Sequence, residues 1–99
     1  MKNYVIINHS DGTAAPASAQ DWGAFFQAVG GSLVDGGKPF TKEKAVLKAG
    51  EIDSSLSDTV AAYYIIKAES LEEAVALTKG SPLADKPGCE VRIYETAQM

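Results

Sequence analysis

The segment 59–67, with the sequence TVAAYYIIK, constrains the fold of this chain more than any other feature. Every residue from 60 to 66 is apolar or aromatic, and side chains of this kind favour β-strands. Because successive side chains of a strand point to opposite faces of its sheet, this strand has two apolar faces. The pattern therefore predicts a central strand that is covered on both sides.

Two helices are predicted, one before this strand and one after it. In the first, three aromatic residues and a valine recur at i, i+3, i+4 and i+7 from Trp22, after a weak capping box at Ser18. The second begins with the capping box SLEE at 70–73 and ends at Lys79-Gly80. The other predicted elements are strands at 4–8, 32–35 and 89–94, a turn at 36–39 and a hairpin at 44–54 around Ala49-Gly50.

The order of these elements matches the split βαβ pattern of ferredoxin-like domains. We therefore expect an α+β fold of βαββαβ topology with a hairpin insertion, in which an antiparallel sheet carries both helices on one face. The strands at 4–8 and 60–66 are expected in its centre. The 99 residues correspond to a single domain, 1–99, in which the stretch 36–58 is an insertion that contains the hairpin.

The second apolar face of the sheet predicts association. Two short helices cover only one face, and soluble monomers rarely expose an apolar patch larger than a few hundred Å². Cys89 is the only cysteine, so no intrachain disulfide compensates for the small core. Stacking against an identical sheet is the simplest cover, and we expect a two-fold homodimer.

The net charge of the chain and the motifs that it lacks argue against several classes of function. The net charge of −4 opposes binding to nucleic acid or to a membrane surface of anionic lipid. The N-terminal segment has too short an apolar run for a signal peptide or a membrane span, so a cytoplasmic location is the expectation. No ligand spacing indicates a metal site, and no motif indicates a cofactor.

Aromatic side chains of the first helix and the central strand are candidates for a ligand pocket. Trp22, Phe26 and Tyr64 can line a concave site for a small apolar or aromatic molecule, although core packing is their more common role. Asp35 ends a short apolar strand, where its carboxylate can enter such a cleft or accept backbone hydrogen bonds in a turn. Lys38 and Phe40 belong to the same segment and are expected to share its role.

Two residues are candidates for catalysis. His9 is the only histidine, and Asp11 follows closely as a carboxylate that can orient a general base. The alternative for His9 is a solvated turn residue at the end of the first strand. Asp35 is the second candidate. Cys89 has no partner motif and is expected to be a buried, inert thiol.

Four segments together resemble the YCII-related family of small bacterial proteins. They span nearly the whole chain and are WGAFF at 22–26, LVDGGKPF at 33–40, YYIIKAESLEEA at 63–74 and GCEVRIYE at 88–95. Members of this family form dimeric α/β barrels, so the resemblance implies the same assembly here.

The resemblance also implies where the chain departs from the founding branch of the family. For that branch, enzymatic action has been proposed through a histidine in the first helix and an aspartate before a proline after the second. Residues 20–29 contain no histidine, and Ser81 stands before Pro82 in place of the aspartate. The chain is more similar to a branch with an LVDxGxPF segment.

Three functions follow as hypotheses. The first is a YCII-related dimeric α/β barrel that binds a small, partly apolar molecule, with minor enzymatic activity as an extension. The second is a non-catalytic interaction or regulatory protein that acts through its dimer or through the 36–58 surface. The third, cofactor-independent oxygenase or isomerase chemistry, rests on fold analogy alone.

Overall fold

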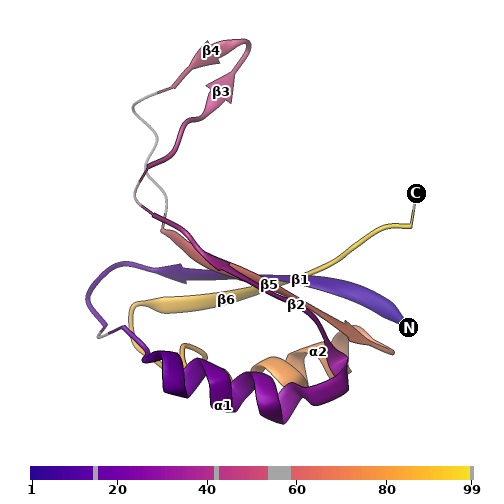
Figure 1. Ribbon diagram of the computed structural model, residues 1–99. Helices are drawn as coiled ribbons and strands as arrows, with labels where there is room; N and C mark the ends of the chain where they lie inside the picture. Colours follow the sequence, from indigo (N-terminus) through magenta and orange to yellow (C-terminus); the bar gives the residue numbers. More distant parts are fainter. Residues whose placement is uncertain (15, 42, 54–58, 99) are drawn as a thin grey trace.

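A computed structural model of the chain describes residues 1–14, 16–41, 43–53 and 59–98 (Figure 1). The elements, in chain order, are β1 (Lys2–Ser10), α1 (Ala19–Val29), a 3-10 turn (Gly30–Ser32), β2 (Leu33–Pro39), β3 (Leu47–Lys48), β4 (Glu51–Ile52), β5 (Val60–Ala68), α2 (Leu71–Thr78) and β6 (Cys89–Glu95). The predicted order of strands and helices is confirmed. Residue 54, the last of the predicted hairpin, lies outside the described residues.

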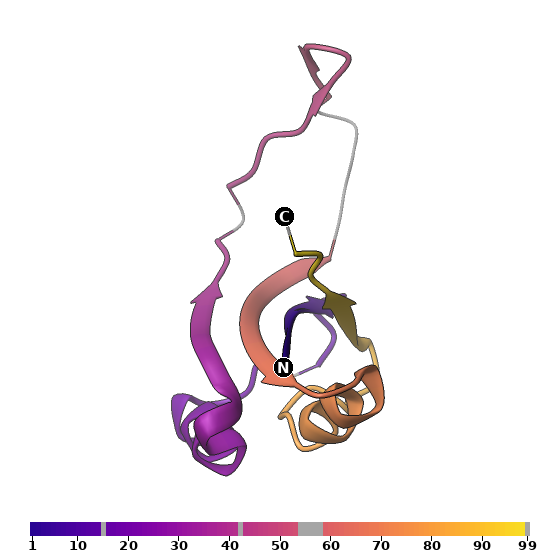
Figure 2. The same cartoon turned by 90° about the vertical axis from the view of Figure 1, so that its right-hand side faces the viewer.

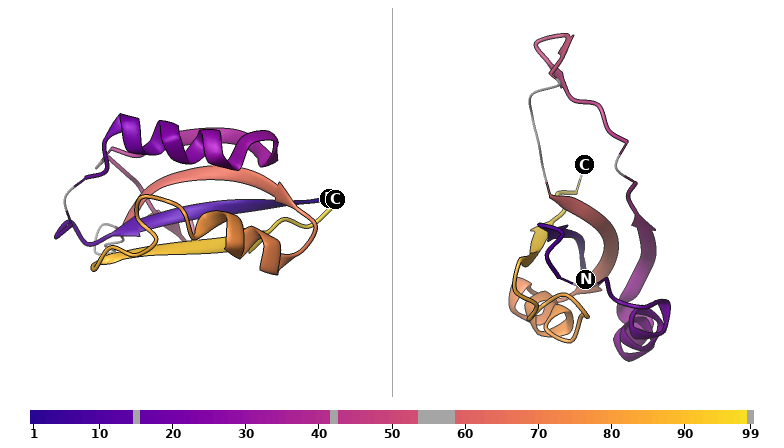
Figure 3. Two further views of the ribbon diagram at one scale, coloured as in Figure 1. Left: turned by 90° about the horizontal axis from the view of Figure 1, so that it is seen from below. Right: turned by 90° about the vertical axis from the view of Figure 1, so that its left-hand side faces the viewer.

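The main sheet has the strand order β2-β5-β1-β6, and each neighbouring pair is antiparallel. The two strands predicted to be central, β1 and β5, are central. Both helices lie on the same face of the sheet, with α1 beside β2 and β5 and α2 beside β6 (Figures 1 and 3). The chain is therefore an α+β protein with an antiparallel sheet and two helices, an arrangement compatible with a ferredoxin-like fold.

The core lies between the sheet and the helices. Alternate residues of β1 and β5 point to this side, and the largest of them are at most 1% exposed: Tyr4, Ile6, Tyr64 and Ile66. The buried cluster is completed by Ala68 of β5, Phe25 and Val29 of α1, and Ala74 of α2. Serine caps fix where the helices begin, because the hydroxyls of Ser18 and Ser70 accept hydrogen bonds from the backbone of Asp21 and Glu73.

The segment predicted as a turn at 36–39 is instead part of β2, and that prediction was wrong. The register of β2 against β5 shifts between Asp35 and Lys38, as in a β-bulge. Gly37 has a φ of 68°, and a Cβ at this position would collide with the carbonyl oxygen of Tyr63. Glycine therefore lets the strand bulge and continue where the sequence pattern indicated a reversal.

The solvated-turn interpretation of His9 was also wrong. His9 belongs to β1, is only 9% exposed and places its Nδ1 3.0 Å from the hydroxyl of Thr59. A register shift between Asn8 and His9 sets it against the beginning of β5. A partner fifty positions away in the sequence keeps this histidine inside the sheet.

The predicted hairpin is present as β3 and β4, which pair Leu47 with Ile52 and Lys48 with Glu51. Ala49 and Gly50 form its two-residue turn with φ values of 53° and 83°. The hairpin projects away from the main sheet on the side opposite to the helices (Figures 1 and 2). None of the helices in the described part of the chain is long and apolar enough to cross a membrane.

Candidate functional site

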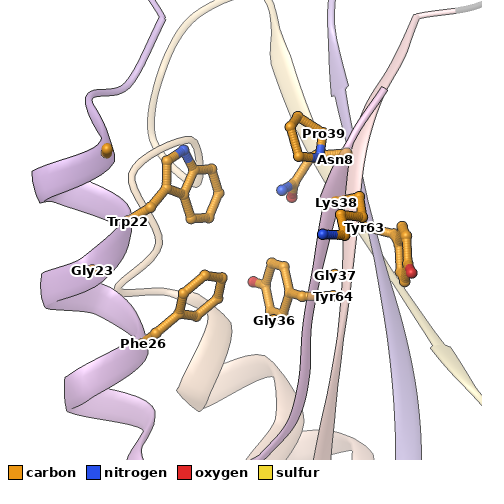
Figure 4. A pocket seen from close by; sticks show the side chains of 12 residues that line it. Asn8, Trp22, Gly23, Phe26, Gly36, Gly37, Lys38, Pro39, Tyr63 and Tyr64 are labelled. Carbon is orange, nitrogen blue, oxygen red and sulfur yellow. The ribbon is translucent and has the colours of Figure 1, made fainter. Parts of the chain in front are cut away.

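A cleft of about 410 Å³ lies between α1 and the sheet (Figure 4). One wall is the sheet-facing side of α1, and the other is formed by β2, β5 and the end of β1. The lining residues are Asn8, Ala19, Trp22, Gly23, Phe26, Gly36, Gly37, Lys38, Pro39, Ala62, Tyr63 and Tyr64. The cleft is therefore mostly apolar, with a small number of polar groups, as ligand sites usually are.

Three aromatic rings form the inner end of the cleft. Trp22 and Phe26 are one helical turn apart on α1, and their ring centroids are 5.8 Å apart. Tyr64 faces them from β5 with edge-to-face geometry, at 6.2 Å from Trp22 and 5.6 Å from Phe26. This arrangement is favourable for aromatic rings, so it fixes a rigid apolar surface beside the remaining open space.

Asn8 is a polar residue that is buried among apolar side chains. It follows Tyr4 and Ile6 on the helix-facing side of β1 and is 1% exposed. Neither Oδ1 nor Nδ2 has a hydrogen-bond partner among the described residues. An unpaired buried polar group costs roughly 1–3 kcal/mol of stability. Its amide points into the cleft toward Trp22 (Figure 4). A molecule bound in the cleft would supply the missing hydrogen bonds and recover the lost stability.

The Tyr64 hydroxyl is a second buried polar group on this wall. It too is without a hydrogen-bond partner in the described part of the chain, as is the nearby Ser81 hydroxyl. Burial raises the pKa of the Tyr64 phenol. Tyr64 therefore stays protonated across the physiological pH range and can donate a neutral hydrogen bond.

The rim of the cleft is formed by the bulged end of β2. The backbone of Gly36 and Gly37 lines it without side chains, which keeps this side open. Lys38 is exposed, and its ammonium group lies on the cleft side of the strand (Figure 4). A positive charge is thus available to an anionic substituent that extends out of the cleft.

The residues predicted for a ligand site divide into two groups. Trp22, Phe26, Lys38 and Tyr64 come together around the cleft. Phe40 does not line it, because its ring stacks on Tyr63 with centroids 5.7 Å apart. Asp35 does not line it either: its carboxylate is exposed and accepts a hydrogen bond of 2.8 Å from the backbone of Gly37. Asp35 therefore has the second of the two roles considered for it from the sequence, which is to accept a backbone hydrogen bond.

His9, the other catalytic candidate, lies apart from this cleft. It lines a separate hollow of about 330 Å³ near Thr59, Glu90 and Arg92. The Asp11 carboxylate accepts hydrogen bonds from the backbone and hydroxyl of Thr13, which lowers its pKa. Asp11 lines the same hollow as His9, but its carboxylate is engaged by its own turn.

Asn8 was missed as a candidate by the sequence analysis. The signal was present, since Asn8 continues the alternation of Tyr4 and Ile6 in a strand predicted to be central. A polar amide at a position of this kind indicates either a buried hydrogen bond or a site. The treatment of Asn8 as the end of the strand hid that signal.

Within the described residues, no group of three or more His, Cys, Asp or Glu side chains is placed to hold a metal ion. Comparison of the chain with protein-family models, with curated proteins and with solved structures finds no match. The candidate site therefore depends on the geometry of the cleft, and the YCII-related resemblance stays a prediction.

Proposed function

We propose that this protein binds a small, planar aromatic molecule in the cleft between α1 and the sheet. The single observation that carries this proposal is the Asn8 amide, which is buried, unpaired within the described chain and directed into a cleft with aromatic walls. Native proteins rarely leave both ends of a buried amide unsatisfied. A bound ligand supplies the missing partners and recovers the free energy lost by burial.

The chemistry of the walls defines the ligand class. Nδ2 of Asn8 donates hydrogen bonds and Oδ1 accepts them, so a matching ligand has a carbonyl next to an N–H. Trp22, Phe26 and Tyr64 favour a flat ring that can pack against aromatic edges. Lys38 favours a carboxylate at the end that faces solvent. A bicyclic aromatic lactam has the first two features, and a carboxylate on its ring adds the third.

Binding of 2-quinolinone, with naphthalene as a control of similar shape, tests this proposal. Trp22 is the only tryptophan and lines the cleft, so its fluorescence responds to a molecule bound there. We expect saturable quenching by 2-quinolinone with a dissociation constant at least about tenfold lower than that of naphthalene, because only the lactam pairs with the amide. Equal affinity for the two compounds, or no saturable change with either, would count against the proposed site.

Lys38→Gln is expected to weaken binding of 2-oxoquinoline-4-carboxylate by about two- to fivefold, because an exposed charge pair contributes at most about 1 kcal/mol. Binding of the neutral 2-quinolinone should not change. The difference between the two probes should disappear in high salt, which screens exposed charges. An equal loss of affinity for both probes would contradict a purely electrostatic role for Lys38.

We also propose that the helix-free face of the sheet pairs with the same face of a second copy, as in a dimeric α/β barrel. Two cross-strand pairs in the centre of this face, Val5 with Ile65 and Ile7 with Tyr63, are apolar and stay partly exposed, whereas their neighbours on the helix side are buried. Burial of this face gives the apolar cover that the isolated chain lacks. A sedimentation measurement that finds only monomer at high micromolar concentration would refute this pairing.

The same observations support binding rather than a particular reaction. His9 lies in another hollow and Asp35 is engaged by the backbone of Gly37, so neither reaches the cleft. A second candidate function, non-catalytic interaction through the insertion, is favoured by the exposed apolar pair Leu47 and Ile52 on the hairpin. A protein that dimerises but binds neither 2-quinolinone nor its carboxylate would favour this second function.

A further inference from the structure

The hairpin β3–β4, with its flanking residues 43–53, is here called the arm. Leu47 and Ile52 face each other across its two strands and are 73% and 71% exposed. Strands of two residues are too short for a hairpin to be stable alone in water. The arm therefore exposes its apolar pair to solvent. Packing against another surface would stabilise the hairpin.

The chain exposes more surface than a compact monomer of its mass. The accessible surface is 6919 Å², whereas a compact monomer of this mass exposes about 5,400 Å². The radius of gyration is 14.6 Å, against about 13 Å for a compact chain of about 100 residues. The excess is about 1,500 Å², and the roughly 800 Å² that each partner buries in a stable interface of standard size fits within it.

The direction of the arm indicates what covers it. The arm and the helix-free face of the sheet lie on the same side of the molecule, opposite to the helices (Figures 1 and 2). A second copy seated on that face would therefore lie beside the arm. In a two-fold dimer the contact is reciprocal, so each arm reaches the partner that occupies its own sheet.

The helix-free face also offers apolar residues to receive an arm. Phe40 and Tyr94 are about half exposed and lie at the two edges of this face, where Phe40 stacks on Tyr63 and Tyr94 pairs with Val5. Large aromatic side chains are enriched in protein interfaces.

We propose that the arm clasps a second copy of this chain, with Leu47 and Ile52 packed on the partner. The inference rests on the sheet pairing proposed above and adds a separate role for the arm within it. The arm thereby strengthens a dimer whose sheets already meet. Its removal should weaken the pairing and leave the cleft of each copy intact.

The double variant Leu47→Ser/Ile52→Ser of the full chain tests this role. Each copy loses two apolar side chains, so the two-fold dimer loses four. We expect the dissociation constant of the dimer, measured by sedimentation equilibrium, to rise at least about 30-fold. The matched control is Lys48→Ser/Glu51→Ser, which changes the neighbouring cross-strand pair of the same hairpin and keeps the net charge. This control should stay within about threefold of the wild type.

The outcomes separate the arm from the sheet pairing. A wild-type dimer that both double variants leave unchanged would overturn the role of the arm and leave the sheet pairing standing. A monomeric wild type would overturn both. A variant that melts at a lower temperature without a change in the dissociation constant would show that the arm packs on its own chain, and would also overturn the inference. An unchanged far-UV circular dichroism spectrum confirms that each variant is folded, whether or not 2-quinolinone binds.

Discussion

Gly37→Ala is expected to destabilise the protein by at least about 3 kcal/mol, or to prevent folding altogether. Two effects add: the residue has a φ of 68°, which alanine adopts only with strain, and a Cβ would collide with the backbone oxygen of Tyr63 on β5. Relief of the collision requires β2 to separate from the central strand. Chemical denaturation followed by circular dichroism measures the loss.

Gly36→Ala is the matched control for this prediction. Gly36 has no positive φ, and a Cβ there would make only an ordinary contact of 3.8 Å with the ring of Phe26. We expect its stability to change by less than about 1 kcal/mol. Equal effects of the two substitutions would show that the bulge in β2 is not the constraint described above.

Asn8→Leu is expected to raise the stability of the ligand-free protein and to remove ligand binding. Leucine has nearly the shape of asparagine, and it replaces an amide that is buried without a partner in the described chain. A gain of about 1–2 kcal/mol is expected, which corresponds to a rise in Tm of roughly 4–16 °C. Affinity for 2-quinolinone should fall at least about tenfold because both amide hydrogen bonds are lost.

Asn3→Leu serves as the control for Asn8→Leu because it makes the same change on the same strand. Asn3 is exposed, so the substitution removes no buried amide and should change neither the Tm by more than a few degrees nor the affinity for 2-quinolinone. A lower Tm for Asn8→Leu would contradict the account, because it would mean that the amide supports the fold through partners of its own.

Much of the fold could be predicted because local patterns and tertiary packing agree. The apolar run of β5 placed it in the centre of the sheet, and the SLEE box fixed the beginning of α2. The course of β2 could not be predicted in the same way. Its Gly-Gly-Lys-Pro segment has the residues of a turn, and only the close approach of the β5 backbone makes it a bulge.

The candidate site was predictable only in part for a similar reason. Helical spacing put Trp22 and Phe26 on one face, and the two-faced strand brought Tyr64 to meet them. His9 could not be placed from sequence because its hydrogen-bond partner, Thr59, is distant along the chain. Asn8 is important because its buried amide has no hydrogen-bond partner among the described residues. A local sequence pattern cannot predict that absence.

We propose that the Asn8 amide is the polar contact of the ligand cleft. The most direct measurement is the side-chain amide resonance of Asn8 in nitrogen-15-labelled protein, recorded as 2-quinolinone and then naphthalene are added. A saturable shift of that resonance with 2-quinolinone, and not with naphthalene, is the predicted result. A resonance that stays unchanged while Trp22 fluorescence is quenched would contradict the claim, because the ligand would then occupy the aromatic wall without meeting the amide.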